Sequence, residues 1–269
     1  MVERLNGIID MHIHSAPDIR ERKLNDLELM EAAVEREVRA IVIKSHFVPT
    51  ADRAYLVNQI RKEKYPNSDF EMFGGIALNQ SVGGINPKAV EAALKLGAKV
   101  VWLPTSTASN HFKKNGKEGG VEVVRDGKVV PEMKDVFELV KEYDAVLATG
   151  HISPEECFRV TEAARNADVK KIVITHPEFH IVGMSMEDRE KIVKDYGVCL
   201  EVVYAQPIGG GVYKKNLPEN VETIRRLEQI TLLFQRTADS FRIRNGTNLL
   251  KNMQITCMMP DLREMRLIP

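Results

Sequence analysis

The sequence predicts an α/β protein with a (β/α)8 TIM-barrel-like fold whose eighth unit, at the C-terminus, is disrupted. Three observations favour this fold class. Short β-branched runs recur along the chain, most of them about 26 to 33 residues apart, which is the length of one strand-plus-helix unit. Amphipathic segments lie between them. Polar residues gather where the runs end, and barrel enzymes carry their active sites at these strand ends, so a barrel is favoured over an open sheet.

Seven runs are expected to form parallel strands. They begin at Gly7, Ala40, Glu71, Ala98, Ala145, Lys171 and Val198. A doubly wound open sheet of the Rossmann kind would need a glycine fingerprint after the first strand, and "HSAPDIRER" contains none.

The segments between these runs carry helix-start signals. Asn86 and Pro87 precede "KAVEAALKLG", which places proline at the first helical position. Ser153 and Glu156 form a capping box before the next clear helix, and Ser185 precedes the acidic first turn of another. Helices are therefore expected to cover the sheet.

Composition excludes several classes of protein. The chain has 38 basic and 38 acidic residues, which gives no electrostatic reason to expect nucleic acid or an anionic membrane as a partner. Three scattered cysteines suit a reducing compartment. With no signal-like N-terminus and no apolar run of about 20 residues, we expect a cytoplasmic protein that acts on a small molecule. The sequence leaves homo-oligomerisation open.

The longest gap between predicted strands contains an insertion, at about residues 106–131. Its "VEVVRDGKVV" predicts a β-hairpin around Asp126 and Gly127. The hairpin would lie in the fourth strand-to-helix loop, on the active face, either as a lid or wall of the active site or as a decorative insertion. A second glycine-rich stretch, "PIGGGVYKKN", lacks the Gly-Lys-Ser/Thr of a phosphate loop and is interpreted as a flexible loop.

The first predicted strand, "IIDMHIHSAPD", carries a polar stripe. Asp10, His12 and His14 alternate with Ile9, Met11 and Ile13, so the two sets are expected on opposite faces. Such a stripe is costly to bury unless something binds it. Asp10 would orient an imidazole or cap a layer of the barrel.

Further polar side chains occur near other strand ends. They are Lys44 and His46 at the second, His151 at the fifth, His176 at the sixth and Glu201 within the seventh. A single histidine after a strand is more often a loop or core residue than a ligand. Several imidazoles and a carboxylate converging in one barrel are what a divalent metal needs, most often zinc. Such a metal would lower the pKa of a bound water towards about 7.

These motifs resemble the amidohydrolase-like metal-dependent hydrolases, and in particular a TIM-barrel branch without an assigned reaction. The likeness rests on "DMHIHSAPD", "IVIKSHF", "LATGHISPEE" and "VITHPEFHIVGMS", and it covers about residues 6 to 233. The resemblance implies that His12, His14, His151 and His176 are metal ligands, binding one or two ions.

The chain departs from the superfamily pattern at strand four, where "VVWLPT" offers no lysine to bridge two metals. Lys44 could instead bridge metals, stabilise charge or be a surface cation, and Glu201 could be a ligand or a general base. We assign both as candidate catalytic residues. Asp18, Arg20 and His46 are candidate substrate-binding residues, with Arg20 suited to a carboxylate or phosphate.

Three other aromatic side chains are left outside this predicted site. His111 and His180 are expected to be structural loop residues. Trp102 is expected to pack in the core.

The C-terminal segment does not fit the pattern. "ITLLF" begins the eighth strand, but residues 235–269 have little periodicity, so we divide the chain into a barrel domain, 1–234, and an aberrant tail. The superfamily expects an aspartate at the end of this strand, and Asp239 is the nearest one. Back-translation from Phe234, read two bases along, can encode Ser-Thr-Asp at this point, so we hypothesise that the tail is translated out of frame; a divergent natural tail is the alternative.

The sequence thus predicts a hydrolase that uses metal-activated water, most often on zinc, to attack an amide, lactone or other ester-type bond. Two alternatives stay open. One is a phosphoesterase like the histidinol-phosphatase-type barrels. The other is a degenerate barrel without activity, because the aspartate of the eighth strand is missing.

Overall fold

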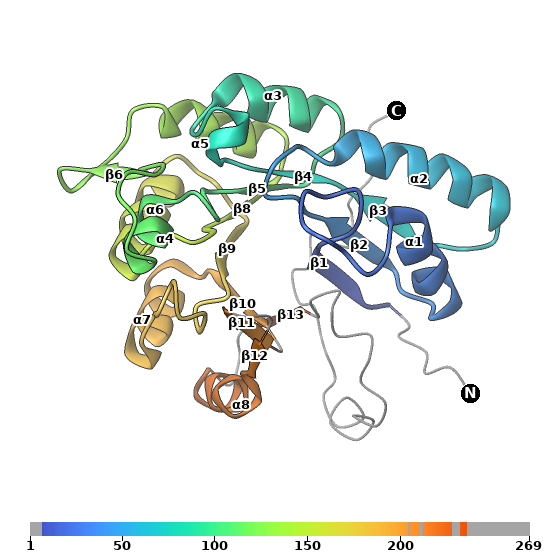
Figure 1. Ribbon diagram of the computed structural model, residues 1–269. Coiled ribbons are helices and arrows are strands. Elements are labelled where there is room, and N and C mark those ends of the chain that lie inside the picture. Colours follow the sequence, from blue (N-terminus) through green and yellow to red (C-terminus); the bar gives the residue numbers. More distant parts are fainter. Residues whose placement is uncertain (1–6, 204, 210–211, 228–231, 236–269) are drawn as a thin grey trace.

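Parallel strands alternate with helices along the chain, as the sequence predicts (Figure 1). The computed structural model describes residues 7–203, 205–209, 212–227 and 232–235. The parallel strands are β1 (Ile9–Ile13), β2 (Ala40–Ile43), β3 (Glu71–Phe73), β4 (Gly75–Ala77), β5 (Val100–Trp102), β8 (Val146–Ala148), β9 (Ile172–Thr175), β10 (Cys199–Val203) and β13 (Leu232–Gln235). All seven predicted runs therefore form strands.

The strands pair in chain order around the fold. One ladder runs β1-β2-β3 and the other β4-β5-β8-β9-β10-β13. β13 lies against β1, which brings the two ends of this order together, although no ladder joins them among the described residues. The fold is thus an α/β arrangement in the order of a (β/α)8 barrel, and the strands that the structure describes do not show closure by hydrogen bonds.

The helices lie outside the strands (Figure 1). They are α1 (Asp26–Glu35), α2 (Ala51–Lys64), α3 (Pro87–Lys95), α4 (Ser109–Lys114), α5 (Met133–Glu142), α6 (Pro154–Asn166), α7 (Met186–Tyr196) and α8 (Leu217–Arg226), with a 3-10 turn η1 (Gln80–Val82). The predicted caps are confirmed. Asn86 accepts backbone N–H groups at the start of α3, Ser153 forms a capping box with Glu156 on α6, and Ser185 caps α7.

The third run is divided at Gly74, so that β3 pairs with β2 while β4 pairs with β5. Both glycines at this point are needed for close packing. A Cβ on Gly74 would collide with backbone atoms of Thr50 and Ala51, and a Cβ on Gly75 would overlap the indole of Trp102. The sequence "EMFGGIAL" therefore changes ladders where side chains would not fit.

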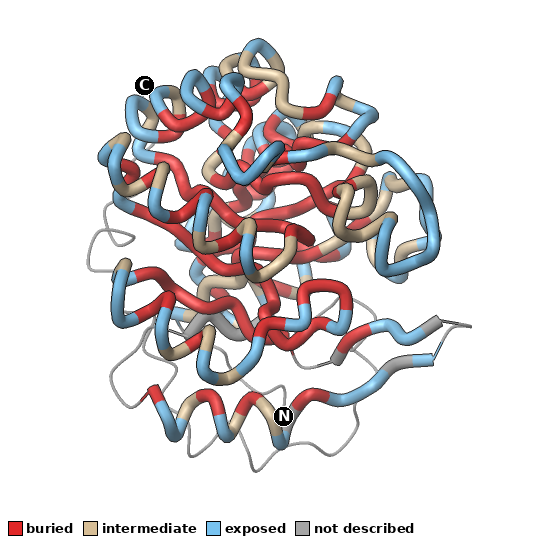
Figure 2. Tube along the Cα trace, turned by 90° about the vertical axis from the view of Figure 1, so that its left-hand side faces the viewer, coloured by how far each residue is buried: buried red, intermediate tan, exposed pale blue. Residues whose placement is uncertain are grey.

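The buried strand residues form two layers. A cluster built from strands alone fills the middle of the fold: Ile9, Met11, Ala40, Val42, Phe73, Ala77, Val100, Trp102, Val146, Ala148, Val173 and Cys199. Alternate strand residues such as Val101 and Leu147 pack outwards against helix residues such as Val136 and Val160. Figure 2 shows the same division, with buried segments through the middle and helices that alternate between buried and exposed.

The first strand corrects one prediction. Ile9 and Met11 do face the strand-only cluster, but Ile13 packs with the outer cluster under α1 and α2. Met11 and Ile13 therefore do not share a face. The cause is a register shift in the pairing with β2 between Asp10 and Ile13, because such an irregularity interrupts the alternation of side chains.

The insertion in the fourth strand-to-helix loop forms the predicted hairpin. β6 (Val124–Arg125) and β7 (Lys128–Val129) pair antiparallel around Asp126 and Gly127, which both have positive φ.

The interpretation of "PIGGGVYKKN" as a flexible loop is wrong. β11 (Ala205–Gly209) and β12 (Val212–Lys215) pair antiparallel across this stretch. Cross-strand pairing holds β11 and β12 together as an antiparallel pair. The glycine content on which the prediction rested gives no information about this pairing.

The described part of the eighth unit is strand β13, which pairs in parallel with β10. The tail from residue 236, including Asp239, lies outside the described residues, so the out-of-frame hypothesis stays a prediction. None of the helices in the described ranges has the length and apolar character that crossing a membrane requires.

Candidate active site

The predicted site residues lie at the carboxyl ends of the parallel strands. Strand alternation explains two of them. Val42 and Cys199 point into the strand-only cluster, so Lys44 and Glu201, two residues further along their chains, continue on the same inward face. Both are buried. The idea that Lys44 is a surface cation is therefore wrong.

Lys44, His12 and Glu201 form a hydrogen-bonded chain. Nδ1 of His12 lies 2.5 Å from Oε1 of Glu201, and Nε2 of His12 lies 2.9 Å from Nζ of Lys44. A carboxylate can only accept and an ammonium can only donate. The chain is thus satisfied by a neutral His12 that donates from Nδ1 and accepts at Nε2.

Burial dominates the protonation of this chain. It lowers the pKa of Lys44 to about 7, an effect that the charge of Glu201 opposes. Burial also raises the pKa of Glu201 and lowers that of His12 well below its usual value. Nζ of Lys44 further lies 4.9 Å from the ring centre of Trp102, which packs in the core as expected.

Five histidines from four strand ends surround one region. The ring centres are 5.3 Å apart for His12 and His14, 4.7 Å for His14 and His46, 5.9 Å for His46 and His151, 4.9 Å for His151 and His176, and 5.9 Å for His12 and His176. Burial lowers the pKa of each. All five are therefore neutral imidazoles, the form that binds a metal or hydrogen-bonds a substrate.

Two of these imidazoles keep a buried nitrogen without a protein partner. Nδ1 of His14 and Nδ1 of His176 are inaccessible to water and make no hydrogen bond in the structure. An unsatisfied buried polar atom is costly. His176 also adopts a positive φ of 28°, a strained conformation for a non-glycine residue of the kind that gathers at functional sites.

The donor chemistry fits a divalent ion in part. Two orphaned nitrogens and neighbouring neutral imidazoles are suitable ligands, and His12 has the tautomer that leaves Nε2 basic while a carboxylate holds Nδ1. Within the described ranges, however, no group of three His, Cys, Asp or Glu side chains is already arranged so that it could hold a metal ion. Lys44 occupies the lone pair that His12 would contribute.

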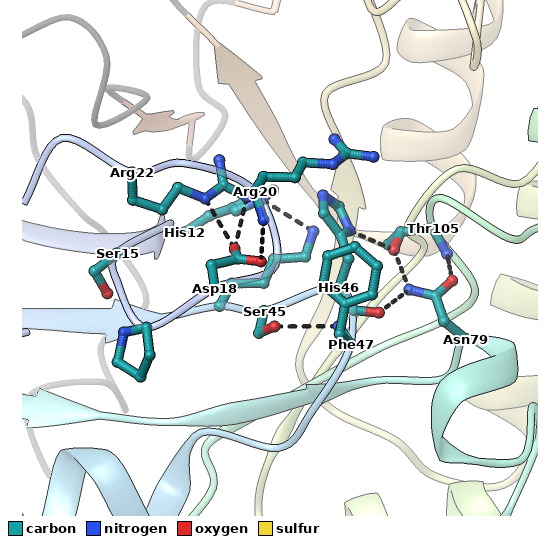
Figure 3. Close-up of polar contacts among 12 residues, drawn as sticks. His12, Ser15, Asp18, Arg20, Arg22, Ser45, His46, Phe47, Asn79 and Thr105 are labelled. Atoms are coloured by element: carbon teal, nitrogen blue, oxygen red, sulfur yellow. Dashed lines mark hydrogen bonds and ion pairs between the residues drawn. The ribbon is translucent and has the colours of Figure 1, made fainter. Parts of the chain in front are cut away.

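His46 is fixed by a buried network between strand ends (Figure 3). Its Nδ1 lies 2.7 Å from Oγ1 of Thr105, and Asn79 donates both to that oxygen and to the backbone carbonyl of His46. Thr105 and Asn79 are members of this network that sequence reasoning missed. The signal available was their position just after predicted strands.

The loop after β1 carries the other two substrate-binding candidates. Asp18 accepts from Nε of Arg22 at 2.8 Å and from the backbone N–H of Arg20 at 3.3 Å, so its carboxylate holds the loop together. Arg20 is exposed. Figure 3 shows the Arg20 side chain extending over His46. Burial is the main cause of the lowered pKa of His46, and the positive charge of Arg20 lowers it further.

The insertion supplies a histidine that sequence reasoning left out. His111 on α4 stacks on His151 with ring centres 4.9 Å apart and Nδ1 atoms 2.7 Å apart. The neighbouring Asn110 donates to the backbone carbonyls of His151 and Ile181. The insertion is therefore a wall of the site. His180, by contrast, hydrogen-bonds Gln206 as a structural residue.

Asp10 contributes locally. Its carboxylate accepts from the backbone N–H of His12 at 3.1 Å, and this contact helps to fix the strand where the register shifts. The structure thus brings together all the predicted metal ligands with Lys44, Glu201 and His46, while Asp18 serves the loop that presents Arg20.

The structure resembles an amidohydrolase from Pseudomonas aeruginosa, with 15% sequence identity and a TM-score of 0.55 over 86% of this chain and 74% of that one. At this identity the similarity concerns the fold.

Two more distant structures were also found. One is a dihydroxybenzoic acid decarboxylase from Polaromonas sp. JS666 with bound manganese, at 11% identity, a TM-score of 0.49 and 86% of each chain. The other is the IolI protein with a zinc atom, at 12% identity, a TM-score of 0.49, 84% of this chain and 88% of that one.

The chain belongs to DUF6282, a family of unknown function, whose model matches residues 7–201. Comparison with curated proteins found no match.

Proposed function

We propose that this protein is a metal-dependent hydrolase that cleaves an amide, lactone or other ester-type bond of a small molecule. The observation that carries the proposal is the gathering of neutral imidazoles at the strand ends, two of them with orphaned Nδ1 atoms. Two buried nitrogens without hydrogen-bond partners, in a group of neutral imidazoles, call for an electrophile that the described residues do not supply.

In this proposal His12, His14, His151 and His176 hold the ion, and zinc is the first candidate because imidazole ligands suit it. When bound, such an ion polarises a carbonyl oxygen and lowers the pKa of water. His12 can take part only after Lys44 releases its Nε2.

The chain's own residues then divide the remaining work. Glu201 accepts the Nδ1 proton of His12 and so fixes the ring and its tautomer. Lys44, once free of His12, is a buried amine whose protonated form can stabilise negative charge developing on the substrate. Arg20 lies at the exposed edge of the site, where it can bind an anionic group of the substrate.

Metal content tests the proposal directly. The full chain is stripped with a chelator, reloaded with zinc, and assayed by elemental analysis beside the double variant His14→Ala/His176→Ala. His180→Ala is the matched control, since that imidazole is bound to Gln206. We expect about one ion per chain in the wild type and the control, and less than about a tenth of that in the double variant. Wild-type protein without stoichiometric metal, or equal content in all three, would refute the metal site.

Turnover is then measured on a panel of ester, lactone, amide and phosphoester substrates, with and without added metal. Metal-dependent hydrolysis of a carbon–oxygen or carbon–nitrogen bond is expected. Activity confined to phosphoesters would replace the proposed reaction with phosphoester hydrolysis.

A second candidate is a metal-binding barrel without turnover. One observation favours it: both ring nitrogens of His12 are engaged by Lys44 and Glu201, and no three-donor group is already assembled among the described residues. Comparing the chain with a version whose frame is restored after Phe234 separates the two. Activity that appears only in the restored version would favour the degenerate barrel for this chain.

A further inference from the structure

We infer that Asn79 and Thr105 are positioning residues that hold His46 as the Nε2–H tautomer, which makes His46 a hydrogen-bond donor to the substrate and excludes it as a metal ligand. The inference rests on the proposed function for its meaning, because it assigns His46 a place in that reaction. The evidence is the assignment of donors and acceptors in a buried hydrogen-bond network, and this assignment does not depend on a bound ion.

The orientation of the Asn79 amide is fixed by its neighbours. Oδ1 accepts from the backbone N–H groups of Thr105, at 2.8 Å, and Thr107, at 3.2 Å. Backbone N–H groups can only donate, so this atom must be the oxygen. Nδ2 therefore points the other way, where it donates to the carbonyl of His46 at 2.8 Å and to Oγ1 of Thr105 at 2.6 Å.

The proton of the Thr105 hydroxyl follows from this orientation. Oγ1 already accepts from Asn79, and its other neighbour among the described residues is Nδ1 of His46, 2.7 Å away. If His46 donated from Nδ1, the hydroxyl proton of Thr105 would have no acceptor in a place where the residue is fully buried. The satisfied arrangement has Thr105 donating to Nδ1, so a neutral His46 carries its proton on Nε2.

The network is well placed to hold this tautomer. Asn79, Thr105 and His46 are all buried, and they come after three different strands, β4, β5 and β2 (Figure 3). Side chains held from separate strands in a dry interior reorganise little. Nε2 of His46 has no hydrogen-bond partner within the described ranges, so its proton is available to a ligand.

This assignment separates His46 from the other imidazoles around it. The His46 ring is close to both His14 and His151, with ring centres 4.7 and 5.9 Å away, so a substrate atom attacked beside those ligands lies within its reach. A neutral N–H donor aimed at a carbonyl oxygen stabilises charge that develops there during hydrolysis. His14 keeps a bare nitrogen for an ion, and His46 presents a proton.

Nitrogen NMR of selectively labelled histidines tests the tautomer without any activity assay. In the metal-free wild type, the proton of His46 is expected on Nε2. Thr105→Ser should keep this pattern because the hydroxyl remains, whereas the near-isosteric Thr105→Val should give a mixture of tautomers. His180, whose Nδ1 faces Gln206 instead, is the internal control and should not change. A wild-type His46 with its proton on Nδ1 would overturn the inference.

Zinc titration and kinetics complete the test. The His46 signals should keep their Nε2 proton when zinc is added, and loss of that proton on metal binding would also overturn the inference. On a hydrolysed substrate, His46→Ala should lower kcat by about 100-fold and Thr105→Val by about 10-fold, with Thr105→Ser near wild type. If the protein binds no metal and yet His46 is the Nε2–H tautomer, the proposed function fails while the assignment of the network stands.

Discussion

Replacement of Gly75 by alanine is expected to destabilise the fold through one identifiable collision. The new Cβ would overlap Cζ3 of Trp102, lie 3.2 Å from Cε3 of the same ring, and lie 2.5 Å from the carbonyl oxygen of Val100. Neither the buried indole nor the backbone of β5 can move away cheaply. Overpacking of this kind costs about 1–3 kcal/mol, and two rigid neighbours place Gly75→Ala at about 2–3 kcal/mol. For a domain of this size, that lowers Tm by about 4–12 °C.

A double-mutant cycle measured by urea unfolding tests the cause. Trp102→Phe removes the ring atoms that meet the new methyl group and costs about 1–3 kcal/mol by itself. Because it makes room for the methyl group, the double variant should be at least about 1 kcal/mol more stable than the sum predicts. Gly74→Ala is the matched control. Its Cβ would meet backbone of Thr50 and Ala51 rather than the indole, so Trp102→Phe should not relieve it. If the Gly75 cycle is additive within about 0.5 kcal/mol, the collision with Trp102 is not the cause.

Three further predictions concern other parts of the molecule. Asn110→Ala removes two hydrogen bonds to backbone carbonyls, so it should cost about 1–3 kcal/mol and speed proteolysis within residues 106–131; Asn115→Ala, which removes one solvent-exposed bond to the carbonyl of His111, should do neither, because water can replace that bond. Burial raises the pKa of Cys157 to about 12, so peptide-mapped alkylation of the folded protein should leave this thiol unmodified, and labelling without denaturant would contradict its burial. Burial lowers the pKa of Lys99 from its usual 10.5; the unfolded chain then binds more protons, so stability should rise with pH from the lowered pKa towards 10.5. Lys99→Met should flatten that rise in urea unfolding, and an unchanged slope would show that Lys99 does not cause it.

The strands and helix starts were predictable because their signals are local. The caps at Asn86, Ser153 and Ser185 are made by side chains that reach backbone N–H groups two or three residues away, so the sequence contains both partners within one turn. The hairpin at Asp126 and Gly127 is equally local, because the positive φ values that its turn needs are set by these residue types.

The failures have non-local causes. Ile13 turns outwards because the pairing of β1 with β2 shifts register, and no pattern within the first strand predicts the position of a partner strand. His111 enters the site because Asn110 fastens α4 to the loops after β8 and β9. The burial of Lys44 depends on Trp102 and His12, which lie on two other strands. In each case the deciding contact joins residues that are distant in the sequence.

The candidate site lies directly against the apolar cluster formed by the strands, at the carboxyl ends of those strands. Val42 and Cys199 belong to the apolar cluster formed by the strands, and one side-chain step further along the same strands come Lys44 and Glu201. Only two residues along the strand separate the apolar side chain from the polar one. The polar groups therefore lie directly on the apolar cluster, which excludes water from them. This explains why burial is the largest cause of the lowered pKa of Lys44 and the raised pKa of Glu201. Trp102 belongs to this apolar cluster, and its ring also lies against Lys44 and His12. A substitution such as Gly75→Ala that displaces the ring should therefore disturb the site as well as the fold.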